Sequence, residues 1–222
     1  MTAPVDNEAL HEMIPKLRAA VAEWETPLVD AMAANGHDPF KILIATIISL
    51  RTKDEVTAVV APRLFARADT PEKMLALTPE QIEVAIYPAG FYRNKARSIL
   101  EVSRLLIEKY GGCVPDEIDE LLTLPGVGRK TANLVVTAGY GKPGICVDTH
   151  VHRITNRWGY VQTKTPEQTE LALREKLPAE YWLEINGLLV SLGQNICHPT
   201  SPKCSRCPVA ASCARIGVVR SR

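Results

Sequence analysis

The chain has 222 residues, of which 46% are hydrophobic and 23% charged, proportions typical of a soluble globular protein with a sizeable core. Its longest largely apolar stretch, residues 42–50, is far shorter than the roughly 20 residues of a membrane-spanning helix. The start of the chain lacks the basic region and apolar run of a secretory signal. We therefore expect a protein with no membrane segment that works in the cytoplasm or at the nucleoid.

Most of the chain shows the apolar spacing of short helices. We predict helices over residues 9–24, 39–50, 54–61, 95–110 and 166–177. Three Thr-Pro-Glu segments, at 70–72, 78–80 and 165–167, are typical of helix starts, because threonine caps a helix and proline fits its first turn. No segment alternates polar and apolar residues over a convincing strand length. The sequence thus predicts an all-α fold.

The segment LLTLPGVGRKTANLVV, residues 121–136, is the most informative in the chain. Its leucines end one helix and its last residues continue another, so the PGVG between them forms a tight turn whose glycines permit positive φ. A turn at a helix N-terminus presents backbone N–H groups that suit a phosphate. We interpret it as a helix–hairpin–helix that grips the DNA backbone through Gly126, Val127, Gly128 and Arg129. The alternative is a plain packing unit.

Lys130 follows in the first turn of the second helix. The positive end of the helix dipole there favours a neutral amine over an ammonium ion. A neutral amine can attack an electrophilic carbon and form a Schiff base. Taken locally, the simpler interpretation is that Arg129 and Lys130 both contact phosphates.

Asp148, in the segment CVDTH, is placed to cap a helix that begins at Thr149. A carboxylate near an amine also suits sugar chemistry, because it can stabilise an oxocarbenium-like centre and help to deprotonate the nucleophile. One residue can do both, since capping fixes its position. Asp148 therefore makes nucleophilic attack by Lys130 a plausible alternative to phosphate binding.

From residue 195 onward the composition changes to cysteine, proline, serine and arginine. Four cysteines follow the pattern Cys197-x6-Cys204-x2-Cys207-x5-Cys213. In a cytosolic chain, four close thiols indicate a metal site rather than disulfides. Zinc and iron–sulfur clusters both use four thiolates, and the spacing alone leaves the choice between them even.

Basic side chains gather in two stretches of this otherwise neutral chain, whose net charge is +1. The first contains Arg93, Lys95, Arg97, Arg104 and Lys109, and the second, which has no acidic residue, contains Lys203, Arg206, Arg215, Arg220 and Arg222. A basic face that binds phosphates is one interpretation. Solvated surface charge is the simpler interpretation for most of these residues.

At the hairpin, at the segment VDTH and at the cysteine pattern, the sequence resembles the endonuclease III family of DNA glycosylases. The similarity runs from about residue 39 to Cys213. It implies two all-α lobes: a six-helix barrel with the helix–hairpin–helix over 32–142, and a second helical domain built from 1–31 and 143–222. The second would carry a [4Fe–4S] cluster in the loop 197–213, held by Cys197, Cys204, Cys207 and Cys213. Damaged DNA would bind between the lobes.

The resemblance also implies an activity: a bifunctional DNA glycosylase and AP lyase of base excision repair that removes oxidised pyrimidines. After the damaged nucleotide leaves the base stack, Lys130 would attack C1′ and form a Schiff base, with Asp148 as the catalytic carboxylate. β-Elimination would then nick the strand. The partner would be double-stranded DNA with a damaged base or an abasic site, and we expect a monomer. Lys203 and Arg206 would lie on a basic loop against this DNA.

One segment departs from the family's pattern. Family members commonly have a glutamine in a Leu-Ser-x-Gln-Thr segment, where it enters the gap left by the extruded nucleotide. Here the stretch is ISLRT, so Arg51 takes that position. Arginine differs from glutamine in reach and charge, which leaves opposite-base readout and lesion preference open. Phe91 matches the family's apolar wedge, and a place in the core is its alternative.

Two other classes remain to be separated by experiment. A monofunctional mismatch glycosylase would share the hairpin, the aspartate and the cluster, but Lys130 and the chain's end at Arg222 speak against it. A non-catalytic DNA-binding module would use Lys130 and Arg129 as phosphate contacts and would not cleave the strand.

Overall fold

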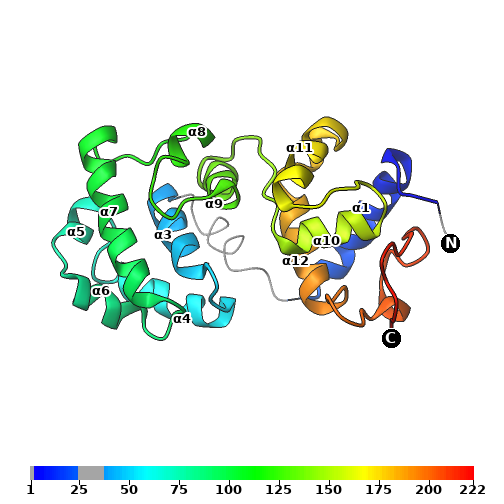
Figure 1. Cartoon of the computed structure of the whole chain (residues 1–222), viewed down its shortest axis with the longest axis horizontal. Coiled ribbons are helices and arrows are strands. Elements are labelled where there is room, and N and C mark those ends of the chain that lie inside the picture. Colours follow the sequence, from blue (N-terminus) through cyan, green and yellow to red (C-terminus); the bar gives the residue numbers. More distant parts are fainter. Residues whose placement is uncertain (1–2, 25–37) are drawn as a thin grey trace. The chain divides into compact units, whose positions relative to one another are not determined.

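The computed structural model describes residues 3–24 and 38–222 (Figure 1). All regular elements in these ranges are helices, which confirms the predicted all-α fold. In the same ranges, no helix is both long and apolar enough to cross a membrane. The chain divides into two compact units, Met1–Pro27 with Ile145–Arg222, here called the terminal unit, and Leu28–Gly144, the hairpin unit. The domain boundary predicted between residues 31 and 32 lies outside the described residues.

The hairpin unit is built around one buried helix, α3. Residues 42–48 of this helix are all buried, as expected for a helix that is apolar on every side. It contacts α4, α7, α9 and the π-helical segment η1 (Figure 1). The elements in chain order are α3 (Pro39–Ser49), α4 (Asp54–Phe65), α5 (Pro71–Leu75), α6 (Pro79–Ile86), α7 (Tyr92–Tyr110), α8 (Ile118–Leu121), α9 (Arg129–Leu134) and η1 (Val135–Gly139).

The terminal unit packs the N-terminal helix against helices from the end of the chain. Its elements are α1 (Asn7–Val21), α10 (Thr149–Arg157), α11 (Pro166–Lys176), the 3₁₀ turn η2 (Ala179–Tyr181), α12 (Ile185–Asn195) and the 3₁₀ turn η3 (Cys204–Arg206). The core combines Leu10 and Leu17 of α1 with Ile154 of α10 and Leu189 of α12. Helix α12 contacts both α1 and α10, so it joins the two ends of the chain in one core.

The three predicted Thr-Pro-Glu helix starts are present. Thr70, Thr78 and Thr165 each accept a hydrogen bond from the backbone N–H three residues later, at 3.3 Å. These caps begin α5, α6 and α11. Helix α4 instead continues beyond its predicted end, through Pro62 to Phe65, because buried Leu64 anchors its last turn in the core.

Candidate active site and cysteine pocket

The predicted hairpin turn lies between α8 and α9. Its two apolar side chains, Leu124 and Val127, are buried, and the Val127 N–H donates to the Leu124 carbonyl at 3.2 Å. Gly126 has φ +79°, a conformation that favours glycine. Gly128 has φ −98° and does not need that freedom, but a Cβ at Gly128 would meet no atom within 4 Å. The turn is therefore anchored by its apolar residues and open at Gly128.

Lys130 is the second residue of α9 and is exposed. The four residues that follow it, 131–134, are all buried, and the Asn133 side-chain amide donates to the Arg129 carbonyl at 3.0 Å. Helix α9 then passes directly into the π-helical η1, a form that often occurs next to functional sites. The lysine thus projects from the first turn of a helix whose remaining residues are fixed in the core.

Asp148 is the N-cap of α10, as predicted. Its Oδ1 accepts hydrogen bonds from the backbone N–H groups of His150 at 2.7 Å and Val151 at 2.9 Å. Two bonds to one oxygen fix the orientation of this half-buried carboxylate. Lys130 belongs to the hairpin unit and Asp148 to the terminal unit.

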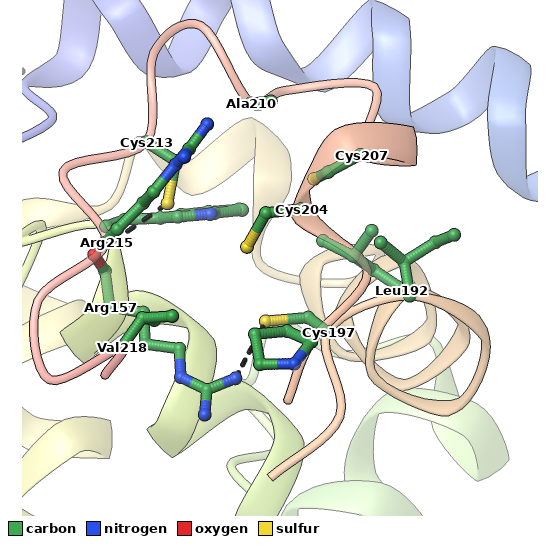
Figure 2. Close-up of a pocket in the computed structure, with 12 residues that line it drawn as sticks. Arg157, Leu192, Cys197, Cys204, Cys207, Ala210, Cys213, Arg215 and Val218 are labelled. Atoms are coloured by element: carbon green, nitrogen blue, oxygen red, sulfur yellow. Dashed lines mark hydrogen bonds between the residues drawn. The ribbon is translucent and has the colours of Figure 1, made fainter. Parts of the chain in front are cut away.

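The four cysteines of residues 197–213, here called the cysteine loop, line one pocket. Trp158, Leu192 and Ile196 also line it. In Figure 2 the sulfur atoms of Cys197, Cys204 and Cys213 face the interior of this pocket. Among the described residues, no three His, Cys, Asp or Glu side chains form a group that could hold a single metal ion.

Burial acts on two of the four thiols. It raises the pKa of Cys207 to about 11 and also raises the pKa of Cys213, so without a bound cation these thiols stay neutral at ordinary pH. A third thiol accepts a hydrogen bond, because the Arg157 Nη1 donates to the Cys197 Sγ at 3.2 Å. A cation that binds all four thiolates would offset the burial that opposes their ionisation.

Helix α10 also holds the beginning of the cysteine loop. Arg153 donates to the Cys197 carbonyl at 2.8 and 3.1 Å. Arg157 donates to the carbonyls of His198 and Pro199, both at 2.7 Å. Neither arginine could be identified from the sequence, because their partners lie 40 or more residues away along the chain.

The two predicted basic residues of the cysteine loop differ in their surroundings. Lys203 is half-buried, and its ammonium donates to the Asn195 carbonyl at 3.2 Å. Arg206 is exposed at the end of η3.

Arg51 and Phe91 lie side by side in the hairpin unit. The Arg51 guanidinium stands 4.7 Å from the centre of the Phe91 ring, and the two residues have positive φ values of 54° and 57°. Phe91 is 56% exposed, which excludes the alternative that it is a core aromatic.

Both interpretations of the first basic stretch, a phosphate-binding face and solvated surface charge, place Lys95 at the surface, and both are wrong for this residue. It is 6% exposed, with its ammonium hydrogen-bonded to Ile48 and Thr52. Helical spacing offered a signal, because Lys95 shares the buried face of α7 with Ile99, Val102 and Leu106.

Residues 44–179 match the family model of HhH-GPD superfamily base excision DNA repair proteins. The chain is 51% identical to endonuclease III of Thermotoga maritima over 176 residues, which cover 79% of this chain and 83% of that protein. It is 40% identical to endonuclease III of Bacillus subtilis over 177 residues, which cover 79% of this chain and 81% of the relative.

Solved structures of endonuclease III are also similar to this chain. A non-covalent endonuclease III–DNA complex matches with a TM-score of 0.84 and 34% identity over 95% of this chain and 96% of that one. A trapped endonuclease III–DNA covalent intermediate matches with a TM-score of 0.83 and 34% identity over 95% of this chain and 97% of that one. The chain belongs to the HhH-GPD superfamily of base excision DNA repair proteins. Within it, the chain is a member of the endonuclease III family, a bifunctional DNA glycosylase and AP lyase.

Proposed function

We propose that this enzyme removes oxidised pyrimidines from double-stranded DNA and that Lys130 is its nucleophile. The observation that carries the proposal is the position of Lys130, exposed in the first turn of an anchored helix next to the hairpin turn. The structural relative trapped as a covalent DNA intermediate supports it, because such an intermediate requires a nucleophilic side chain.

The chemistry follows from an amine and a carboxylate. The damaged nucleotide leaves the base stack, and the neutral Lys130 amine attacks C1′ as the bond from C1′ to the base breaks. Loss of a proton from nitrogen and opening of the sugar ring give a Schiff base. Removal of a C2′ proton then expels the 3′ phosphate, which nicks the strand. Asp148, fixed by its two cap bonds, stabilises positive charge at C1′ and takes a proton from the lysine.

Several groups would bind the DNA. The turn residues Gly126, Val127, Gly128 and Arg129 contact phosphates, a role that the open space at Gly128 supports. Arg206 and Lys203 contact the backbone from the cysteine loop. Arg51 and Phe91 fill the gap left by the extruded nucleotide, a role that the exposure of Phe91 supports. We propose that the enzyme acts as a monomer.

We also propose that the four cysteines hold a [4Fe–4S] cluster. The donor set fits, because four thiols from one loop line a single pocket and four cysteine thiolates are the usual ligands of such a cluster. When bound, the cluster supplies structural support for the basic loop and no step of base removal. The choice over zinc rests on the family, because the cysteine spacing suits both.

Borohydride trapping tests the nucleophile. The wild type should form a covalent adduct with duplex DNA that carries thymine glycol or an abasic site, and Lys130→Ala should abolish it. Lys109→Ala, at an exposed lysine at the end of α7, is the matched control and should trap normally. Absence of any adduct with the wild type would remove the lyase mechanism.

The Asp148→Asn variant removes the negative charge but keeps the helix cap, because asparagine also caps helices. We expect stability to change by no more than about 0.5 kcal/mol, while the rate of adduct formation falls roughly 10²–10⁴-fold. An unchanged rate would leave Asp148 as a cap alone.

Elemental analysis tests the cofactor. Iron with a visible absorbance that bleaches when the metal is lost supports the cluster. Zinc without visible absorbance contradicts it.

A further inference from the structure

Lys95 joins two loops of the hairpin unit. Its ammonium donates to the Ile48 carbonyl at 2.6 Å and to the Thr52 Oγ1 at 2.7 Å. The same Thr52 oxygen accepts the backbone N–H of Gly90 at 3.0 Å. These bonds tie the loop between α3 and α4 to the loop between α6 and α7, through one buried side chain at the start of α7.

Each of these loops presents one exposed side chain in a strained backbone conformation. Arg51 has φ 54° and Phe91 has φ 57°, and left-handed conformations of such residues cost about 1–3 kcal/mol each. They persist only where the surroundings hold them. The loops also meet directly, since a Cβ on Gly90 would stand 2.6 Å from the Arg51 carbonyl oxygen. The Arg51 guanidinium stacks on the Phe91 ring as a result.

Burial of an ammonium group is unfavourable, because the charged group loses its hydration. Burial lowers the pKa of Lys95 to about 8, and its hydrogen-bond partners are two neutral oxygens rather than a carboxylate. An apolar side chain of similar length would pack here without loss of hydration. It would not, however, bind the last turn of α3 and Thr52 at the same time.

We propose that Lys95 is a positioning residue that holds Arg51 and Phe91 as one stacked pair before DNA binds, so that opposite-base selectivity depends on Lys95. The inference rests on the proposed function, in which this pair fills the gap left by the extruded nucleotide. Preorganisation matters for selectivity, because a guanidinium has a fixed fork of donors and discriminates only when its direction is fixed. A freely rotating Arg51 would bind any orphan base.

The test compares kcat/KM for one lesion placed opposite each of the four bases. We expect the ratio between the best and the worst opposite base to fall about tenfold in Lys95→Met, a loss on the scale of one charged hydrogen bond. In the Lys95→Met background, Arg51→Ala should change this ratio little further. Lys109→Met, at an exposed position of the same helix, should leave it unchanged.

A uniform fall in all four rates, with the ratio preserved, would show a merely structural role and overturn the inference. Thr52→Val is the second variant, because it removes the shared acceptor and keeps the lysine, and it decides the question where Lys95→Met does not fold. A preserved ratio in Thr52→Val also overturns the inference. Borohydride trapping by the wild type on an abasic duplex tests the proposed function separately, so the two failures are distinguishable.

Discussion

The cysteine loop and the residues that surround Lys95 each hold irregular backbone in a defined shape around a small cluster of polar atoms, but the polar atoms differ. In the cysteine loop, four thiols surround a pocket, and the pKa values of Cys207 and Cys213 are raised by burial. Around Lys95, backbone and hydroxyl oxygens surround an ammonium that belongs to the chain itself.

The two regions differ in the source of the positive charge. In the hairpin unit this charge is the Lys95 ammonium, which belongs to the chain, so the loops around it can take their final shape as the chain folds. If the four cysteines hold the cluster that we propose, the cysteine loop takes its cation from outside, and its folding would be linked to metal uptake. Arg153 and Arg157 hydrogen-bond the beginning of this loop, and Val209 in its middle is buried in the core of the terminal unit.

The largest expected effect is a loss of structure in the cysteine loop, with the hairpin unit unchanged. Cys207→Ser should lose most of its bound metal, and amide hydrogen exchange should show lost protection over residues 197–213 with α9 unchanged. Cys113→Ser, at an exposed cysteine outside the loop, should match the wild type in both measurements. Full protection of the loop without metal would show that the protein contacts alone suffice.

A smaller effect concerns the internal cation. Burial lowers the pKa of Lys95 from 10.5 to about 8, so between these values the unfolded chain binds more protons than the native protein. The free energy of unfolding therefore rises with pH in that window. Relative to Lys95→Met, the wild type should gain about 2 kcal/mol between pH 7 and pH 9.5.

Urea unfolding of both proteins at the two pH values measures this difference, and the comparison cancels every other titrating group. An identical pH dependence would mean that the ammonium keeps its hydration. Burial of the Lys95 ammonium would then have no measurable cost in free energy, and the comparison with the cysteine loop would not hold.

Local signals made much of this structure predictable. The threonine caps and the Asp148 cap hold because a cap involves residues two or three positions apart. The start of α9 also follows from the sequence PGVGRK. The all-α fold came from apolar spacing alone, without any tertiary information.

Features that depend on distant partners were not predictable. Lys95 was grouped with surface charge because its acceptors lie 43 and 47 residues away. Helix α12 was missed because its N-cap residue, Glu184, makes no side-chain cap hydrogen bond, so nothing local marks its start. Arg153 and Arg157 of α10 could not be distinguished from surface arginines in the sequence, because their partners lie in the distant cysteine loop.

The smallest expected effect concerns the hairpin turn, where one glycine is needed for the backbone conformation and another for DNA binding. Gly126→Ala places a side chain at φ +79° and should lower the free energy of unfolding by about 1 kcal/mol. Gly128→Ala adds its Cβ to open space at φ −98° and should leave stability unchanged within about 0.5 kcal/mol.

The same pair should behave differently on DNA. Gly128→Ala should weaken binding to an undamaged duplex at fixed salt, because its methyl group would occupy the space a phosphate needs. The salt dependence should stay as in the wild type, since no charge is lost. If Gly128→Ala bound DNA like the wild type, no phosphate would approach this glycine. The open side of the turn would then reflect packing alone, and the cysteine loop with its exposed Arg206 would become the better candidate for the main backbone contact.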